Sequence, residues 1–175
     1  MFANPRQNLK YLNLLPGHKV ADLGAGSGDY TLAAAEAVGP TGRVFAVEVQ
    51  KELLDRLRGQ AQTAGLGNVD IIWGDIEMPG GVKLADQSVD AVIISNILFQ
   101  VDSQFGLARE AKRILVPKGQ ALVVDWQDSY GGLGPVVDQV FDQVKATEVM
   151  TKAGLTLTNT FDAGDHHYGL VFSNT

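Results

Sequence analysis

Short continuous runs of apolar residues alternate along this chain with longer stretches in which apolar residues recur at helical spacing. The runs are bounded by glycine, proline or acidic residues, a pattern typical of strands that are buried on both faces of a sheet. The predicted strands are His18–Leu23, Arg43–Val47, Val69–Trp73, Val89–Ser95, Gln120–Trp126, Leu155–Phe161 and His167–Phe172. The last two are predicted to form a hairpin around Ala163-Gly164.

The stretches between the strands predict helices, most of which end at a glycine or a Gly-Pro pair. The predicted helices are Gln7–Leu15, Tyr30–Val38, Lys51–Ala64, Gly106–Leu115 and Val136–Ala153. Two segments, Ile76–Gln87 and Gln127–Pro135, show no clear period and are rich in turn residues, so we expect loops there. Pro117-Lys-Gly119 predicts a turn before the fifth strand.

Strands that alternate with helices, followed by a terminal hairpin, indicate an α/β fold. We expect a Rossmann-like, doubly wound sheet with right-handed crossovers and an antiparallel last strand. The chain has 175 residues, 45% of them hydrophobic. Because a chain of this size buries roughly 70% of its unfolded surface, we expect a single domain over residues 1–175. Ligands of such folds bind at the carboxyl ends of the strands.

The charge and residue composition narrow the classes of partner. Asp and Glu number 20 against 14 Lys and Arg, which gives a formal net charge of −6 and disfavours a nucleic-acid partner. Cysteine is absent, so neither disulfides nor thiolate metal sites are expected. We also expect no signal peptide and no membrane span, because no apolar run approaches the ~20 residues that a span needs. The expected location is cytoplasmic.

The first predicted strand stops at a glycine-rich segment, Val20-Ala-Asp-Leu-Gly-Ala-Gly-Ser-Gly28. Glycines allow positive φ and let a ligand approach the main chain, and the amides of the following helix point toward such a ligand. The pattern therefore predicts a loop that binds a nucleotide-like molecule. A purely structural tight turn is the alternative for a glycine loop taken alone.

Two acidic residues follow the next strands at the same predicted edge of the sheet. Glu48 ends the second strand about 20 residues after the last glycine, where a carboxylate can accept hydrogen bonds from both ribose hydroxyls. Asp75 ends the third strand, where a carboxylate can accept from an adenine amino group. Taken alone, Glu48 would be a solvated side chain and Asp75 a turn residue.

Five segments in order carry a family resemblance: Asp22–Gly28, Val47-Glu48, Gly74–Ile76, Asp90–Ser95 and Leu115–Gly119. With them the chain resembles the class I S-adenosylmethionine-dependent methyltransferases, over nearly its whole length. Within that family it is most similar to small methyltransferases of the ubiquinone-biosynthesis and arsenite-methylating type. The resemblance implies seven strands in the order 3-2-1-4-5-7-6, with strand seven antiparallel.

The resemblance also implies a cofactor site. It makes Asp22, Gly24 and Gly26 the floor under the methionine moiety, and it gives Ser95 a backbone contact to the amino-acid portion. Glu48 would bind the ribose, and Asp75 with Ile76 the adenine. The full expected set is Asp22, Gly24, Ala25, Gly26, Gly28, Glu48, Val49, Asp75, Ile76 and Ser95. S-adenosylmethionine has a net positive charge, which suits a pocket that contains three acids.

The acceptor side is expected on the loops after strands four and five, with Asn96, Phe99, Trp126 and Tyr130 lining the pocket. His166 and His167 are candidates for a catalytic base, and Asp125, at the end of strand five beside Trp126, is a further catalytic candidate. Neighbouring side chains on a strand face opposite ways, so at most one of the two histidines faces any given site, and a packed aromatic pair is the alternative. Asp162, Asp165 and His166 surround a hairpin tip and are not expected to bind a metal.

The sequence therefore predicts an S-adenosylmethionine-dependent methyltransferase that acts on a small-molecule acceptor by in-line transfer. A catalytically silent cofactor-binding module remains an alternative. A nicotinamide-dependent oxidoreductase is disfavoured, because the glycines are spaced G-x-G-x-G and Asp29 stands where the dinucleotide fingerprint has its third glycine. The sequence does not identify the acceptor.

Overall fold

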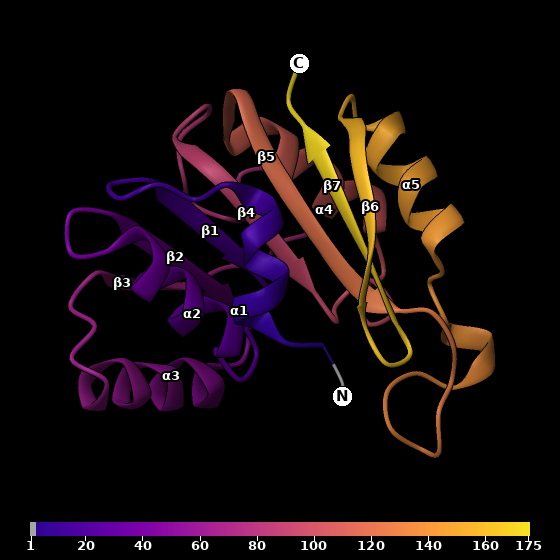
Figure 1. The fold of residues 1–175 in the computed structure, drawn as a ribbon, viewed down its shortest axis with the longest axis horizontal. Helices are drawn as coiled ribbons and strands as arrows, with labels where there is room; N and C mark the ends of the chain where they lie inside the picture. Colours follow the sequence, from indigo (N-terminus) through magenta and orange to yellow (C-terminus); the bar gives the residue numbers. More distant parts are fainter. Residues whose placement is uncertain (1–2) are drawn as a thin grey trace.

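A computed structural model describes residues 3–175 and contains one seven-stranded sheet in the order β3-β2-β1-β4-β5-β7-β6 (Figure 1). The strands are β1 Lys19–Leu23, β2 Arg43–Glu48, β3 Val69–Trp73, β4 Val89–Ser95, β5 Leu115–Trp126, β6 Thr156–Gly164 and β7 His167–Ser173. Strands β1 to β5 pair in parallel, and β7 runs antiparallel to both β5 and β6. The expected fold class and strand order are confirmed.

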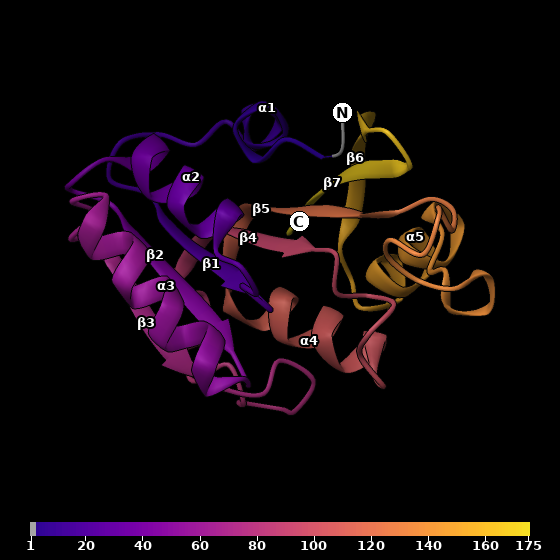
Figure 2. The ribbon, with the colours of Figure 1, turned by 90° about the horizontal axis from the view of Figure 1, so that it is seen from below.

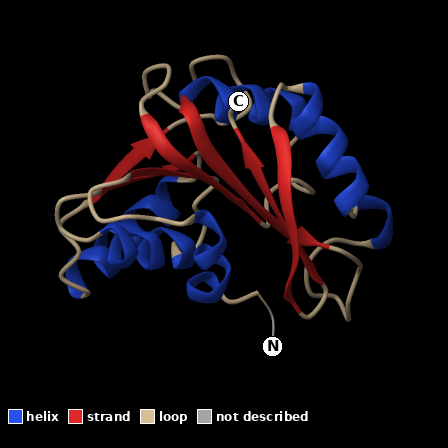
Figure 3. Ribbon diagram, turned by 45° about the horizontal axis from the view of Figure 1, so that its top comes forward, coloured by secondary structure: helices blue, strands red, loops and turns tan. Residues whose placement is uncertain are grey.

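Helices cover both faces of this sheet, as Figures 2 and 3 show. The helices are α1 Pro5–Asn8, α2 Asp29–Val38, α3 Lys51–Thr63, α4 Gln104–Ile114 and α5 Gln143–Lys152, with short 3₁₀ helices at Leu9–Leu12 and Val137–Gln139. Helices α1, α2 and α3 lie on one face, and α4 and α5 lie on the other. Among residues 3–175, no helix combines the length and apolar character needed to cross a membrane.

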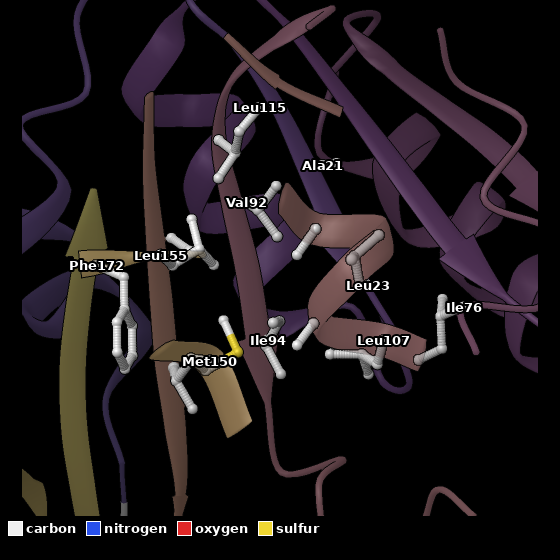
Figure 4. Packing of buried hydrophobic residues seen from close by; sticks show 14 of the residues in the cluster. Ala21, Leu23, Ile76, Val92, Ile94, Leu107, Leu115, Met150, Leu155 and Phe172 are labelled. Atoms are coloured by element: carbon white, nitrogen blue, oxygen red, sulfur yellow. The ribbon is translucent and has the colours of Figure 1, made fainter. Parts of the chain in front are cut away.

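The apolar strand runs follow from burial on both faces. Along β1, Val20 packs into the core under α2, whereas the next residue, Ala21, packs into the core under α4 and α5. Both residues are completely buried. Figure 4 shows the second of these cores, in which Leu107 of α4 and Met150 of α5 cover the central strands. Because neither face of a central strand meets water, the sequence shows continuous apolar runs there.

Two predicted helices have different limits in the structure. The first begins at Pro5 rather than Gln7, because the Asn4 side chain caps it by accepting from the Gln7 amide. It ends at Asn8 and continues as the 3₁₀ helix Leu9–Leu12, which stops because Asn13 adopts a left-handed backbone with φ 46°. The prediction of a helix over Val136–Ala153 is wrong for its first third. Helix α5 begins only after Asp142, whose side chain accepts from the Lys145 amide as an N-cap.

The strand limits on the far side of the sheet also differ from the prediction. Strand β5 begins at Leu115, so the turn predicted at residues 117–119 lies inside the strand. The pairing with β4 shifts register there, because Val89 pairs with Leu115 and Ala91 pairs with Gln120. Lys118 has φ 66° at that point. The hairpin turn lies two residues later than predicted, since Gly164 still belongs to β6 and the chain turns at Asp165-His166.

Candidate functional site

A cleft of about 540 Å³ lies at the carboxyl ends of β1, β2, β3 and β4. Its walls come from the loops that follow these four strands and from the segment that precedes α1. It is lined by Ala3, Pro5, Gly24, Ala25, Gly26, Ser27, Asp29, Tyr30, Glu48, Val49, Gln50, Leu53, Gly74, Asp75, Ile76, Glu77, Ser95, Asn96, Ile97, Gln100 and Val101. The position agrees with the rule that open α/β sheets bind ligands at this edge.

The three glycines after β1 have three different roles. Gly26 has φ 52°, and a Cβ added to it would meet only the Gly24 carbonyl oxygen, at 3.8 Å, so its backbone is open to a ligand. A Cβ on Gly24 would lie 2.8 Å from Ile97, which closes over the loop. Gly28 does not line the cleft, and a Cβ there would strike Leu57 of α3 at 2.2 Å. Gly28 therefore allows close packing of the loop against α3. Its predicted contact with the ligand stays a prediction.

Glu48 ends β2 in the cleft wall and is 6% exposed. Its carboxylate accepts hydrogen bonds from the backbone amides of Val49 at 2.8 Å, Gln50 at 3.0 Å and Gly26 at 3.2 Å. These contacts fasten the glycine loop to the end of β2. A carboxylate offers about four acceptor positions, so a lone pair remains for a ligand hydroxyl.

Asp22 lies beneath the glycine loop, is 1% exposed and does not line the cleft. Its Oδ2 accepts from the Thr31 hydroxyl at 2.6 Å, whereas Oδ1 is buried and has no hydrogen-bond partner among the residues described. Burial raises the pKa of this carboxyl from 3.8 to about 6, although the Thr31 hydrogen bond opposes the shift. Asp22 Oδ1 therefore has room in its hydrogen bonding for one donor, and a ligand with a positively charged N–H group could supply it.

The charged side chains that line the cleft are all acidic. Its lining includes the carboxylates of Asp29, Glu48, Asp75 and Glu77, and no Lys, Arg or His of residues 3–175 lines it. Asp75 is exposed and accepts from the Glu77 amide at 2.9 Å, while its neighbour Ile76 is buried. An acidic cleft attracts a ligand with net positive charge and repels a pyrophosphate.

The end of β4 places Ser95 and Asn96 in the cleft wall. Asn96 has φ 52°. Its backbone N–H donates to the Val124 carbonyl at 2.9 Å, and its backbone carbonyl accepts from Gln100 Nε2 at 2.8 Å. Its Oδ1 is buried without a hydrogen-bond partner in the described part of the chain. Such unsatisfied groups and left-handed non-glycine residues gather at ligand sites. Asn96 and Asp22 both fit an S-adenosylmethionine site, because that cofactor brings an ammonium donor.

Asp125, predicted as a weak catalytic candidate, does not line the cleft and is completely buried. Its Oδ2 accepts from the amides of Ile97 at 3.1 Å and Leu98 at 2.8 Å, and its Oδ1 accepts from the Trp126 amide at 2.8 Å. Burial raises its pKa from 3.8 to about 7, against these hydrogen bonds. The carboxylate contacts the backbone of the cleft wall and is shielded from the cleft itself.

The other predicted acceptor-side residues gather beyond β4 and lie outside the cleft lining. At the end of β5, the ring of Trp126 lies 4.3 Å from the ring of His167, which is buried and whose pKa is lowered by that burial. Tyr130 stacks on His166 at 4.0 Å, and His166 Nδ1 lies 2.7 Å from Asp128 Oδ1. The two histidines thus contact different aromatic rings, but His166 lies in the turn before β7, so the alternation expected for two strand neighbours does not apply to them.

Phe99 also lies outside the cleft lining, although it follows Asn96 in the same loop. Its place in the wall is taken by Ile97, Gln100 and Val101, which the sequence analysis did not single out. The roles of Phe99, Trp126, Tyr130, His166 and His167 stay predictions. No group of three or more metal-ligating side chains occurs within residues 3–175.

The segment 3–8 supplies two further lining residues that the sequence analysis missed: Ala3, which precedes α1, and Pro5, the first residue of α1. The signal that predicts the helix start there is Asn4-Pro5, a capping residue followed by proline at the first helical position. Asn8 fastens this segment by donating to the Tyr30 hydroxyl at 2.9 Å and to the Ala163 carbonyl at 3.2 Å. The segment therefore forms a fixed edge of the cleft beside the glycine loop.

Comparison with known proteins identifies the family. A family model described as "Methyltransferase domain" matches residues 14–169. Demethylmenaquinone methyltransferase of Staphylococcus aureus strain JH9 is 32% identical over 118 residues, which cover 67% of this chain and 46% of that protein. The match thus spans less than half the length of the staphylococcal protein.

Two solved structures share the fold. An S-adenosylmethionine-dependent methyltransferase from Aquifex aeolicus has a TM-score of 0.90 at 23% identity, and the alignment covers 99% of this chain and 91% of that one. The [4+2]-cyclase SpnF has a TM-score of 0.80 at 15% identity, over 97% of this chain and 78% of that one. Since the family model covers most of the chain, the chain belongs to the methyltransferase domain family.

Proposed function

We propose that this chain binds S-adenosylmethionine in the cleft at the carboxyl edge of the sheet and transfers its methyl group to a small-molecule acceptor. The observation that carries the proposal is the acidic lining of the cleft beside the open backbone of Gly26. A cation with a nucleoside portion satisfies both features. A nicotinamide dinucleotide would bring a pyrophosphate to four carboxylates and no basic side chain of the described lining.

Different residues of the cleft are assigned to different parts of the cofactor. We assign the ribose hydroxyls to Glu48, whose carboxylate keeps a free lone pair beside Gly26. Asp75 and Ile76 provide an acceptor and an apolar surface for the adenine. Asp22 and Asn96 carry two of the three buried side-chain oxygens that have no hydrogen-bond donor among the described residues, and the ammonium of the methionine portion is assigned to this end of the cleft.

Methyl transfer from a sulfonium needs few catalytic side chains. When bound, the cofactor supplies an activated methyl carbon, which a nucleophile attacks in line while the carbon–sulfur bond breaks and its electron pair goes to sulfur. The chain then has to orient the reactants and exclude water. Ile97 and Val101 give the wall after β4 an apolar character, and Pro5 adds an apolar residue from α1. A catalytic base is not required for an acceptor that is already a good nucleophile.

The acceptor is proposed only as a small molecule. The name of the staphylococcal relative makes demethylmenaquinone one member of the test set. Phe99, Trp126 and Tyr130 remain the predicted acceptor contacts, because they follow β4 and β5 at the edge of the sheet that holds the cleft. The SpnF likeness shows that this fold also occurs in a protein named as a cyclase, so binding and transfer need separate tests.

Methyl transfer can be tested with labelled S-adenosylmethionine and a panel of thiols, phenols, amines, arsenite and demethylmenaquinone. We expect label in at least one acceptor, and we expect Trp126→Ala to lower turnover more than cofactor affinity. Phe105→Ala is the control, because Phe105 is an exposed aromatic residue on α4 outside the cleft lining. Tight cofactor binding without transfer to any member of the panel would favour the silent binding module.

A further inference from the structure

Asp125 is a buried acid that the proposed chemistry does not use. It is completely buried, and within the described part of the chain its hydrogen-bond partners are the backbone amides of Ile97, Leu98 and Trp126. Burying a carboxylate without a cation is costly, and here three backbone hydrogen bonds offset only part of that cost, since the pKa of Asp125 is still raised. A role in the working of the cleft accounts for this arrangement better than a role in folding.

The amides that Asp125 holds belong to the wall of the cleft. The loop 96–101 leaves β4 through Asn96, whose backbone has φ 52°, and reaches the completely buried Leu98. Between them, Ile97 turns its side chain to the glycine loop, where its Cγ1 lies 2.8 Å from the position that a Cβ on Gly24 would take. A chain of contacts thus runs from β5 through the Ile97 backbone to the cofactor loop on β1.

We propose that Asp125 is a positioning residue whose ionised carboxylate holds the loop 96–101 against Gly24 and thereby fixes the shape of the cofactor cleft. An ionised carboxylate only accepts hydrogen bonds, and all three facing groups are N–H donors. A neutral acid would turn an O–H donor toward at least one of these amides and would accept more weakly from the others, so the clamp would loosen. The identity of the ligand rests on the proposed function, whereas the clamp itself does not.

The ionisation state of Asp125 changes near neutrality, because burial raises its pKa to about 7. The titratable groups around it are few. On β7, Tyr168 is the register partner of Asp125, and His167 is the register partner of Trp126. Burial raises the pKa of Tyr168, and the charges of Asp125 and of Asp142, which precedes α5, raise it further. The clamp should therefore be closed above pH 7 and open below it.

The effect of Asp125 on stability has the opposite sign. A carboxyl whose folded pKa is raised from 3.8 to about 7 favours the folded state most at low pH, and this contribution is lost as the pH rises through 7. Ionisation thus weakens folding while it closes the clamp. A purely structural role would give no reason for the ionised form.

The clamp can be measured directly by ¹H–¹⁵N NMR of the wild-type protein without ligand. We expect the amide resonances of Ile97, Leu98 and Trp126 to titrate with one midpoint near pH 7, and this titration should vanish in Asp125→Asn. Asp90→Asn is the matched control, because Asp90 accepts from the Lys19 amide at 2.8 Å at the other end of β4. It should leave the titration unchanged.

A second readout is the affinity for S-adenosylhomocysteine, measured by calorimetry at pH 6 and pH 8. At pH 8, Asp125→Asn should bind about tenfold more weakly than wild type, the size of losing one hydrogen bond to a charged group. At pH 6 the two proteins should converge, since the wild-type carboxyl is then protonated. Asp90→Asn should match wild type at both values.

The outcomes separate the clamp from the proposed function. Absence of a common amide titration in wild type overturns the clamp and needs no variant to fold. Equal affinity of wild type and folded Asp125→Asn at pH 8 overturns its link to the cleft. If wild type shows the amide titration and binds no S-adenosylhomocysteine, the proposed function fails and the clamp stands.

Discussion

Buried carboxylates occur in two regions of this molecule, and their surroundings differ. Asp22 and Asp125 lie at the carboxyl edge of the sheet, beside the cleft, and burial raises the pKa of each. Glu110 lies on α4, is 3% exposed, and has a pKa below its usual value. The two regions show what a buried acid does with and without a positive partner.

Glu110 is fully paired. It accepts from Arg113 Nε and Nη2, both at 2.8 Å, and from the Gly80 amide at 3.0 Å. Burial alone would raise its pKa, but these hydrogen bonds and the Arg113 charge outweigh it. An acid with a lowered folded pKa contributes stability above its unfolded pKa, and the contribution is lost as the pH falls through the folded value.

Asp22 and Asp125 have no such partner among the side chains described, so they weaken the folded state at neutral pH. An acid that costs stability is expected where a ligand or a moving loop needs its charge. The paired acid fastens the Gly80–Val82 loop to α4, and the unpaired acids are available for function. Four substitutions test this contrast.

The largest effect is expected for Glu110→Ala. Breaking a buried ion pair costs about 3–5 kcal/mol, and the lower end applies because Arg113 also pairs with Asp86 at 2.8 Å. Urea unfolding at pH 7 measures it, and affinity for S-adenosylhomocysteine should not change. Asp55→Ala removes an exposed pair with Arg58 and should cost at most about 1 kcal/mol. Equal losses in the two variants would contradict the contrast.

Gly26→Val should lower cofactor affinity by about a hundredfold or more, roughly 2.7 kcal/mol, while the protein still folds. The added side chain would enter open space that the ligand needs. Gly39→Val is the control, because Gly39 has φ 67°, has no atom within 4 Å of an added Cβ, and lies outside the cleft. Circular dichroism must accompany the titration. Normal binding by folded Gly26→Val would make the loop a structural turn only.

Glu48→Ala should weaken S-adenosylhomocysteine binding by about 1.5–3 kcal/mol, the value of a hydrogen bond to a charged group. Part of the loss will come from the Gly26 amide that Glu48 holds. Glu36→Ala is the matched control, since Glu36 pairs with Arg6 on the surface and does not line the cleft. An unchanged dissociation constant would remove Glu48 from the ribose site.

The smallest effect is the pH dependence that Asp22 imposes. Its pKa is about 6, so cofactor affinity should rise as the pH rises through 6 and the carboxylate becomes able to attract an ammonium. Binding at pH 6 should release protons, which calorimetry detects as heats that vary with the buffer. Asp22→Asn should remove the proton release at pH 6 that comes from Asp22 and leave the rise in affinity near pH 7 that Asp125 imposes. Proton uptake on binding would show that the ligand brings no positive charge to Asp22.

Much of the fold could be predicted from the sequence, because apolar runs and glycine stops report burial directly. The limits that failed depend on contacts invisible to a local pattern. Val136 and Val137 suggest a helix, but both are largely exposed, and the helix starts at the Asp142 cap. The β6–β7 turn lies later than predicted because Gly164 still pairs with His167 in the sheet.

That Gly26, Glu48 and Asp75 line one cleft could be predicted, because they follow or end strands whose carboxyl ends share an edge of the sheet. The other wall could not be predicted, since side-chain direction within a loop depends on tertiary contacts. Asn96, Ile97, Gln100 and Val101 line the cleft while Phe99 does not, and Asp125 shapes that loop from behind. Hydrogen bonds across 27 or 28 positions leave no local sequence signal.

The most direct test of the central claim is a calorimetric titration of the wild-type protein with S-adenosylhomocysteine and with NAD in parallel. The acidic cleft predicts saturable one-site binding of S-adenosylhomocysteine and no heat from NAD at about millimolar concentration, where a Kd of 1 mM is only about −4.1 kcal/mol. Saturable NAD binding with no heat from S-adenosylhomocysteine would contradict the assignment of the cleft to a cationic methyl donor.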